Sequence, residues 1–279
     1  MLKKYLSYLP AVLPWALLVA LFAPVFHLLY IERWDMVDYG HAPFILPISL
    51  FIAWTKRKVL IEIAQRSINK FYLPGFLLLA FSAFLFTFGW RWDYLLIQVI
   101  SLIPLLIGML SFFFGPAIIR PLAFPITYIL LLVPPPIGIL DSITVPMRQF
   151  ASVSAEIVLK TFHYPVTRQG LLLHLGGHEI FLGAPCSGFR SLITMFSLGL
   201  IYVYFNKGDM KKNIVLILSI VPLAIFGNVV RVLIITLLTY YFGSEVGQGF
   251  LHETSGVVVF LIMLTGLMII ERYMRGKKK

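Results

Sequence analysis

The sequence predicts an all-α integral membrane protein with about eight transmembrane helices. Of its 279 residues, 59% are hydrophobic and 13% are charged, whereas a soluble domain is about 45–50% apolar and about 25% charged. Apolar stretches long enough to cross a bilayer recur along the chain, and most basic residues lie between these stretches. No internal repeat, linker or low-complexity segment interrupts this pattern, so residues 1–279 are interpreted as a single domain.

Each predicted span is an apolar run of roughly the length that a helix needs to cross the hydrocarbon layer. The second span is shorter, but Trp54 and Lys56 are typical of an interfacial end. The N-terminal run is too long for a signal peptide and lacks a small-residue cleavage site. The eight spans are expected at about residues 6–30, 41–55, 71–90, 94–115, 117–134, 185–206, 213–242 and 252–271.

The distribution of lysine and arginine predicts the orientation, because these residues favour cytoplasmic loops. With eight spans and the N-terminus inside, sixteen of them lie in inner segments and five in outer segments. Both termini are therefore expected to be cytoplasmic. The net charge of +11 is attributed to this topology, so no nucleic-acid partner is predicted.

The largest outer segment is expected at about residues 134–183, between the fifth and sixth spans. Apolar residues recur at roughly helical spacing from Asp141 to Phe162, which predicts an amphipathic helix along the membrane surface. The following VTRQGLLLHLGGHEIFL alternates around Gly-Gly and predicts a short hairpin.

A zinc site is the alternative interpretation of this hairpin segment. His174, His178 and Glu179 include the i, i+4 spacing of a helical zinc pair. Two glycines lie between the histidines, however, and favour the hairpin over a helix. We therefore predict no metal and no other cofactor.

Ionisable side chains within apolar spans are costly and are candidates for function. The single cysteine, Cys186, begins a span at the outer face, and Arg190 lies one turn later and is expected to point deeper into the bundle. Arg231 follows Asn213, the inner start of its span, by 18 residues, which is roughly 27 Å along a helix. His252 opens a span that descends from outside. Cys186, Arg231 and His252 are thus expected at one outer level.

These three residue types suit acyl transfer through a covalent intermediate. A helix N-terminus or a nearby cation lowers the pKa of a thiol, and His252 can hold and deliver a proton. The Arg231 guanidinium can donate to a carbonyl oxygen that develops negative charge. Asn228 shares a helix face with Arg231 and is expected either to orient it or to add a donor. Gly188 and Gly256 permit close approach of helices or substrate.

Each candidate also has a purely structural interpretation. A lone cysteine is more often a small buried hydrophobic residue, and an arginine near an interface often snorkels. A histidine there can be satisfied by the backbone. The convergence of all three at one depth favours catalysis over three separate structural roles.

The same residues resemble the exosortase/archaeosortase family of membrane-embedded, transpeptidase-like enzymes. The resemblance implies that Cys186 is the nucleophile and that Arg231 and His252 are the other catalytic residues, with Ser187, Gly188, Arg190 and Asn228 in support. It rests on APCSGFRSL at 184–192, PLAIFGNVVRV at 222–232 and GFLHETSG at 249–256, and extends through residues 119–146 and, more loosely, 38–48.

The resemblance also implies the substrates and the location. The partners would be exported proteins with a C-terminal sorting signal, meaning a short Pro-containing motif, one transmembrane helix and a basic tail, as in PEP-CTERM proteins. The enzyme would cut at the motif through an acyl-thioester and transfer the new carboxyl end to an unknown surface acceptor. It would reside in the lipid bilayer of the bacterial inner membrane, with its active site facing the periplasm.

Two other functions stay open from the sequence. One is a cysteine hydrolase that uses the same residues but releases its product to water. The other is a transporter with functional intramembrane arginines, which internal repeats and helices broken at the midplane would support. The sequence shows neither feature.

Overall fold

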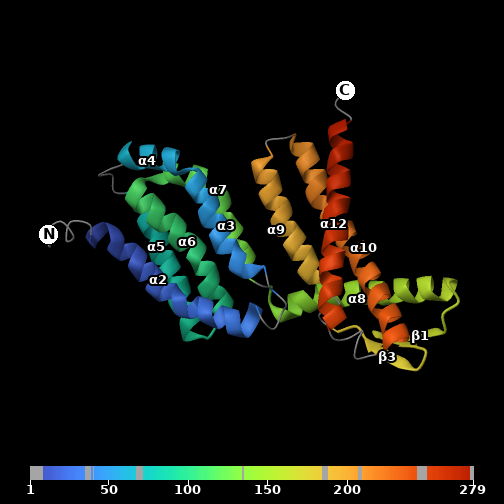
Figure 1. Cartoon of the computed structure of the whole chain (residues 1–279). Coiled ribbons are helices and arrows are strands. Elements are labelled where there is room, and N and C mark those ends of the chain that lie inside the picture. Colours follow the sequence, from blue (N-terminus) through green and yellow to red (C-terminus); the bar gives the residue numbers. More distant parts are fainter. Residues whose placement is uncertain are drawn as a thin grey trace. The chain divides into compact units, whose positions relative to one another are not determined.

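The computed structural model is mostly helical, and its helices fall on the predicted apolar stretches. The chain divides into two compact units, Met1–Pro134 and Pro135–Lys279 (Figure 1). The single domain over residues 1–279 stays a prediction. The structure describes residues 9–34, 39, 41–66, 72–133, 135–183, 188–206, 209–243 and 250–276.

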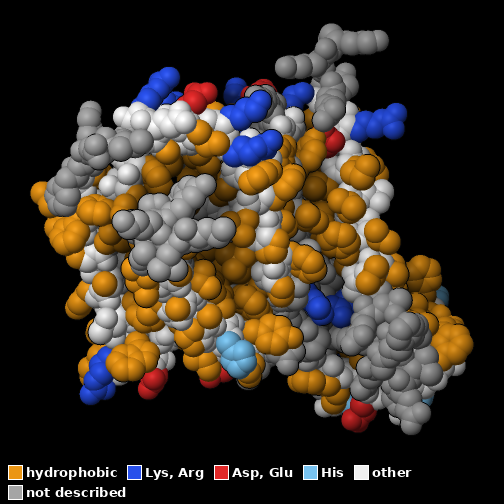
Figure 2. Space-filling view, turned by 60° about the vertical axis from the view of Figure 1, so that its left-hand side comes forward, with side chains coloured by type: hydrophobic (Ala, Val, Ile, Leu, Met, Phe, Trp, Pro, Cys, Tyr) orange, Lys and Arg blue, Asp and Glu red, His pale blue; other side chains and the backbone are white. Residues whose placement is uncertain are grey.

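Within these residues, five helices are long and apolar enough to cross a membrane. Three shorter apolar helices occupy the remaining predicted positions. Figure 2 shows hydrophobic side chains over most of the visible surface, with few charges among them. The all-α membrane fold is confirmed, whereas eight crossings and cytoplasmic termini stay predictions. The five helices are Val12–Glu32, Leu73–Arg91, Leu95–Phe114, Met210–Phe242 and Gly256–Met274, and the shorter three are Ala42–Thr55, Pro116–Leu132 and Phe189–Phe205.

The N-terminal unit is a helical bundle. Its elements are α2 (Leu9–Leu29), η1 (Tyr30–Trp34), α3 (Ala42–Thr55), α4 (Arg57–Arg66), α5 (Leu73–Arg91), α6 (Leu95–Phe114), η2 (Pro116–Ile118), α7 (Ile119–Tyr128) and η3 (Ile129–Leu132).

Small residues let α5 and α6 pack closely. A Cβ added at Gly75 would lie 2.9 Å from the backbone nitrogen of Phe112, and one at Gly108 would lie 2.9 Å from that of Leu79. Across the same interface the Ser82 hydroxyl donates to the carbonyl of Ser101 at 2.8 Å. Lipid offers no hydrophobic drive between helices, so close van der Waals contact and such hydrogen bonds hold the pair together.

The C-terminal unit combines helices with a small sheet. Its elements are α8 (Ile137–Thr161), β1 (Val166–Gln169), β2 (Leu172–Leu175), β3 (His178–Phe181), α9 (Phe189–Phe205), α10 (Met210–Phe242) and α12 (Phe250–Gly276). Figure 1 shows α9, α10 and α12 side by side, with α8 crossing their direction at the end where the sheet lies.

The predicted hairpin is confirmed and gains a third strand. The three strands pair antiparallel in the order β1-β2-β3, with Val166 opposite Leu175 and Leu172 opposite Phe181. Gly170 and Gly176 occupy the two turns with φ of 62° and 59°, a conformation that glycine adopts without steric cost. The first turn was missed because Gly170 lacks the paired glycine of the second.

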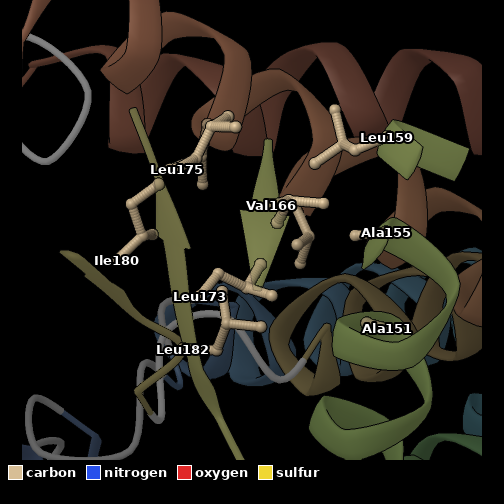
Figure 3. Close-up of a cluster of buried hydrophobic side chains, with 10 residues drawn as sticks. Ala151, Ala155, Leu159, Val166, Leu173, Leu175, Ile180 and Leu182 are labelled. Atoms are coloured by element: carbon tan, nitrogen blue, oxygen red, sulfur yellow. The ribbon is translucent and has the colours of Figure 1, made fainter. Parts of the chain in front are cut away.

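The sheet covers one face of α8. Figure 3 shows Val166 and Leu173 of the sheet with Ala151, Ala155 and Leu159 of α8 in one buried cluster, to which α10 also contributes. The opposite face of α8 is apolar and exposed. A helix with a covered face and a bare apolar face fits the predicted position along the membrane surface. The exposed residues are Ile139, Ile143, Phe150, Val153 and Ile157.

Candidate active site

Three packed helices bring the predicted site segments to one end of the C-terminal unit. Below the site, α9, α10 and α12 share a buried apolar cluster with Met195 from α9, Ala224 from α10 and Met263 from α12. Gly227 allows α10 and α12 to approach, since a Cβ there would lie 2.8 Å from the side chain of Val259. Gly227 was not among the residues predicted from sequence, although it directly precedes Asn228.

The first contact of the site joins the start of α9 to α10. Gly188 precedes α9 with φ 70° and ψ −1°, the left-handed conformation that glycine favours. A Cβ added there would lie 2.8 Å from Cβ and Cγ of Asn228 and 3.0 Å from its Oδ1. The chain two residues after Cys186 is therefore pressed against the Asn228 side chain.

The second contact joins α10 to α12. The Arg231 side chain is buried, with 6% of its surface exposed. Its Nη2 lies 3.9 Å from the position of a Cβ added at Gly256. Gly256 is one turn after His252 on α12. The guanidinium thus lies beside the helix that carries His252.

Two of the predicted residues, Cys186 and Ser187, lie outside the described residues, as does the side chain of His252. The structure therefore places Gly188 beside Asn228, and it places Arg231, the one member of the proposed trio whose side chain is described, beside Gly256. The catalytic roles of the trio stay predictions.

The two intramembrane arginines differ in environment. Arg231 is buried, whereas Arg190 is exposed in the first turn of α9. The expectation that Arg190 points deeper into the bundle is therefore wrong. The sequence gives only its depth along the helix, and the face that packs against α10 and α12 is decided by the tertiary fold.

Asn228 is almost fully buried, with 2% of its surface exposed. Within the described part of the chain neither its Oδ1 nor its Nδ2 has a hydrogen-bond partner. A buried polar group in this state typically costs about 1–3 kcal/mol. Since Asn228 does not bond to Arg231, the expectation that it orients the guanidinium loses support, and the alternative of an added donor remains.

The two hairpin histidines lie on strands, so they are not the i, i+4 pair of one helix that a helical zinc site requires. His174 pairs across the strands with Glu179, and its Nδ1 lies 3.4 Å from the carboxylate. His178 is adjacent to Glu179 in β3, and neighbouring strand residues point to opposite faces. The strand geometry therefore separates His178 from the other two residues.

The fold and these contacts define a multi-pass membrane protein in which Gly188 lies against Asn228 of α10, and Arg231 of α10 lies beside Gly256 of α12. The family model for Transmembrane exosortase (Exosortase_EpsH) matches residues 34–269. The chain therefore belongs to the transmembrane exosortase family, which is generally a family of cysteine transpeptidases. No curated protein and no solved structure gives a significant match to the chain.

Membership of this family indicates processing of sorting signals on substrate proteins at the membrane. The matched range includes the Cys186, Arg231 and His252 segments. It also includes the whole of α8 and the sheet, so the family match covers the elements that surround the site.

Proposed function

We propose that the protein is a cysteine transpeptidase that cleaves C-terminal sorting signals of exported proteins and transfers them to a surface acceptor. The observation that carries the proposal is the pair of contacts made by one turn of α10. Asn228 lies against Gly188, two residues after Cys186, and Arg231 lies beside Gly256, one helix turn after His252. The substrates are proteins with a Pro-containing motif, a transmembrane helix and a basic tail.

The reaction follows from the chemistry of the three residues. His252 takes the Cys186 proton, and the thiolate attacks the scissile carbonyl carbon. Arg231 donates to the carbonyl oxygen as it becomes negative. The intermediate collapses when the C–N bond breaks, and His252 returns the proton to the leaving amine. The acceptor then attacks the thioester, gives its proton to His252 and releases the Cys186 thiolate.

The depth of Arg231 supports a site at the outer face of the inner membrane. The α10 helix has 33 residues, about 50 Å at about 1.5 Å per residue, whereas the hydrocarbon layer is about 30 Å thick. Arg231 is 21 residues after Met210, or roughly 32 Å along the helix. If α10 starts at the cytoplasmic surface, as the charge distribution predicts, the guanidinium reaches the opposite interface.

The nucleophile is tested by Cys186→Ala. Removal of a catalytic nucleophile lowers turnover by several orders of magnitude, so uncut substrate is expected to accumulate in the membrane. Immunoblotting of substrate and enzyme in the same membranes checks both processing and enzyme level. Near-normal processing by Cys186→Ala would end the thiol mechanism.

Transfer and hydrolysis are distinguished by the product. Mass spectrometry of the new C-terminus is expected to show an added acceptor group. A free carboxylic acid as the sole product would instead establish the cysteine hydrolase, with the same nucleophile and no acceptor.

A further inference from the structure

At the level of the site, α10 packs against both α9 and α12. Gly227 and Arg231 lie toward α12, where a Cβ at Gly227 would meet Val259 and where Arg231 approaches Gly256. Asn228 lies toward α9, where it contacts Gly188. Of these α10 residues, Asn228 is the one placed against the chain segment that carries the cysteine.

The start of α9 is suited to a negatively charged oxygen. This helix has 17 residues, and the residue that precedes it is a glycine, which supplies no capping side chain. The first N–H groups of a helix have no partner within the helix, and the helix dipole adds partial positive charge there. Negatively charged ligands are stabilised at such an end.

The Asn228 amide supplies the second, independent observation at this end of α9. Its side chain is 2% exposed, and both polar atoms lack partners among the residues that the structure describes. Oδ1 is the polar atom beside Gly188, at 3.0 Å from the added Cβ position, while Nδ2 lies farther away. The Asn228 side chain thus lies beside the helix start with Oδ1 toward Gly188, and its Nδ2 is a buried donor without a partner among the described residues.

The geometry points to Asn228 as a further catalytic residue of the proposed reaction, with its Nδ2–H donating to the oxygen of the scissile carbonyl. As the carbon–sulfur bond forms, the carbonyl π electrons move to this oxygen, and they return when the C–N bond breaks. Asn228 stabilises the charged oxygen from the α9 side and Arg231 from the α12 side, one helix turn apart. This assignment rests on the proposed function.

A competing role is structural. The Asn228 carbonyl would then only accept from the first N–H groups of α9 and fix that helix start. The two roles require opposite chemistry, since a catalytic Asn228 donates and a capping Asn228 accepts. Asn228→Asp separates them, because aspartate has the same shape, accepts at least as well at a helix N-terminus, and cannot donate when ionised.

The test uses the full-length enzyme in membranes with a substrate that bears a sorting signal, under single-turnover conditions. Asn228→Leu is expected to lower the cleavage rate by about 100- to 1,000-fold, the usual effect of losing one oxyanion donor. Asn228→Asp is expected to be at least as slow. Both variants should still co-purify with uncut substrate and still react with iodoacetamide at Cys186.

The matched control is Thr236→Val. Thr236 is a fully buried residue of the same helix, and its hydroxyl also lacks a partner in the described part of the chain. Valine has nearly the same shape, so Thr236→Val should cleave at the wild-type rate. Near-wild-type cleavage by Asn228→Asp would overturn the donor role, as would equal losses for Thr236→Val and Asn228→Leu. If Cys186→Ala were active instead, the proposed function itself would fail.

Discussion

The two units differ in whether all of their buried polar side chains are hydrogen-bonded, although Ser152 and Thr239 of the C-terminal unit do donate to backbone carbonyls. In the N-terminal unit, the buried serines and the buried glutamine donate to backbone carbonyls of their own or a neighbouring helix. In the C-terminal unit, Asn228 and Thr236 are just as buried but have no partner among the described residues. The N-terminal set consists of Ser49, Ser82, Gln98, Ser101 and Ser111, and every member makes such a bond.

This difference separates buried polar groups that hold helices together from buried polar groups that make no such bond, one of which, Asn228, is the proposed donor to substrate. A serine bonded to a carbonyl of the next helix stabilises packing in a bilayer and leaves no donor free for substrate. An amide that is buried without a partner weakens the fold, and that cost is offset when a substrate supplies the acceptor. Polar residues in spans are therefore better classified by their partners than by their presence.

The largest expected effect is at Arg231. An ammonium cannot replace a guanidinium that donates two hydrogen bonds, so Arg231→Lys should lose about 100- to 1,000-fold in turnover. Arg190→Lys is the matched control, because Arg190 is the exposed intramembrane arginine and should keep measurable activity. Processing assays in membranes, normalised to enzyme level, compare the two. The reverse order of activity would contradict the assignment of Arg231.

A second prediction concerns the contact between Gly188 and Asn228. Gly188→Ala forces a methyl group to within 2.8 Å of Asn228, and a displacement of about 1 Å in a site can cost about 100-fold in rate. Gly170→Ala is the control, since Gly170 also has positive φ but, among the described residues other than its two chain neighbours, no atom lies within 4 Å of its Cβ position. Both variants carry about 1–2 kcal/mol of backbone strain.

Gly188→Ala is expected to lower the cleavage rate by about tenfold or more, as such displacements do. Gly170→Ala is expected to cleave at a near-normal rate per folded molecule. Thermal unfolding in detergent measures the shared strain, and single-turnover cleavage measures the specific effect. Equal rates for the two variants would show that the contact with Asn228 does not matter for turnover.

A smaller effect is expected in the N-terminal unit. Ser82→Ala removes the 2.8 Å hydrogen bond to Ser101, and such bonds between membrane helices contribute about 0.6 kcal/mol on average. The unfolding temperature should fall slightly, while cleavage per folded molecule stays unchanged. A rate loss comparable to that of Asn228→Leu would break the distinction between the two units.

The smallest expected effect depends on pH and concerns Glu156 on α8. The carboxylate accepts from Lys160 at 2.8 Å and from Arg168 of β1 at 2.9 Å. These two hydrogen bonds hold the pKa of Glu156 below its usual value, and the bond from Lys160 has the larger effect. A lowered folded-state pKa stabilises the protein above the unfolded-state pKa, and this contribution is lost as pH falls through the folded-state pKa.

Glu156→Gln should therefore be slightly less stable than wild type at pH 7, by about 1 kcal/mol or less for a surface ion pair. The difference in unfolding temperature should shrink as the buffer is acidified below the usual carboxyl range. A difference that stays constant with pH would mean that the glutamate stabilises α8 by shape and not by charge.

The sequence by itself determined where the apolar helices and the first hairpin signal lie, because hydrophobicity and turn residues act locally. The Cys186, Arg231 and His252 segments were also visible, since residues at known intervals along helices have predictable depths. The family resemblance rested on those same segments and is confirmed by the match over residues 34–269.

Only the tertiary structure decided which helix each polar side chain meets. It placed Asn228 against Gly188 instead of Arg231, buried Arg231 and exposed Arg190. It also added β1 ahead of the predicted hairpin, because α8 and α10 cover the sheet and stabilise that strand. These outcomes depend on contacts between residues far apart in the chain. The helical repeat determines which residues share one face of a helix, but it does not determine which other element packs against that face.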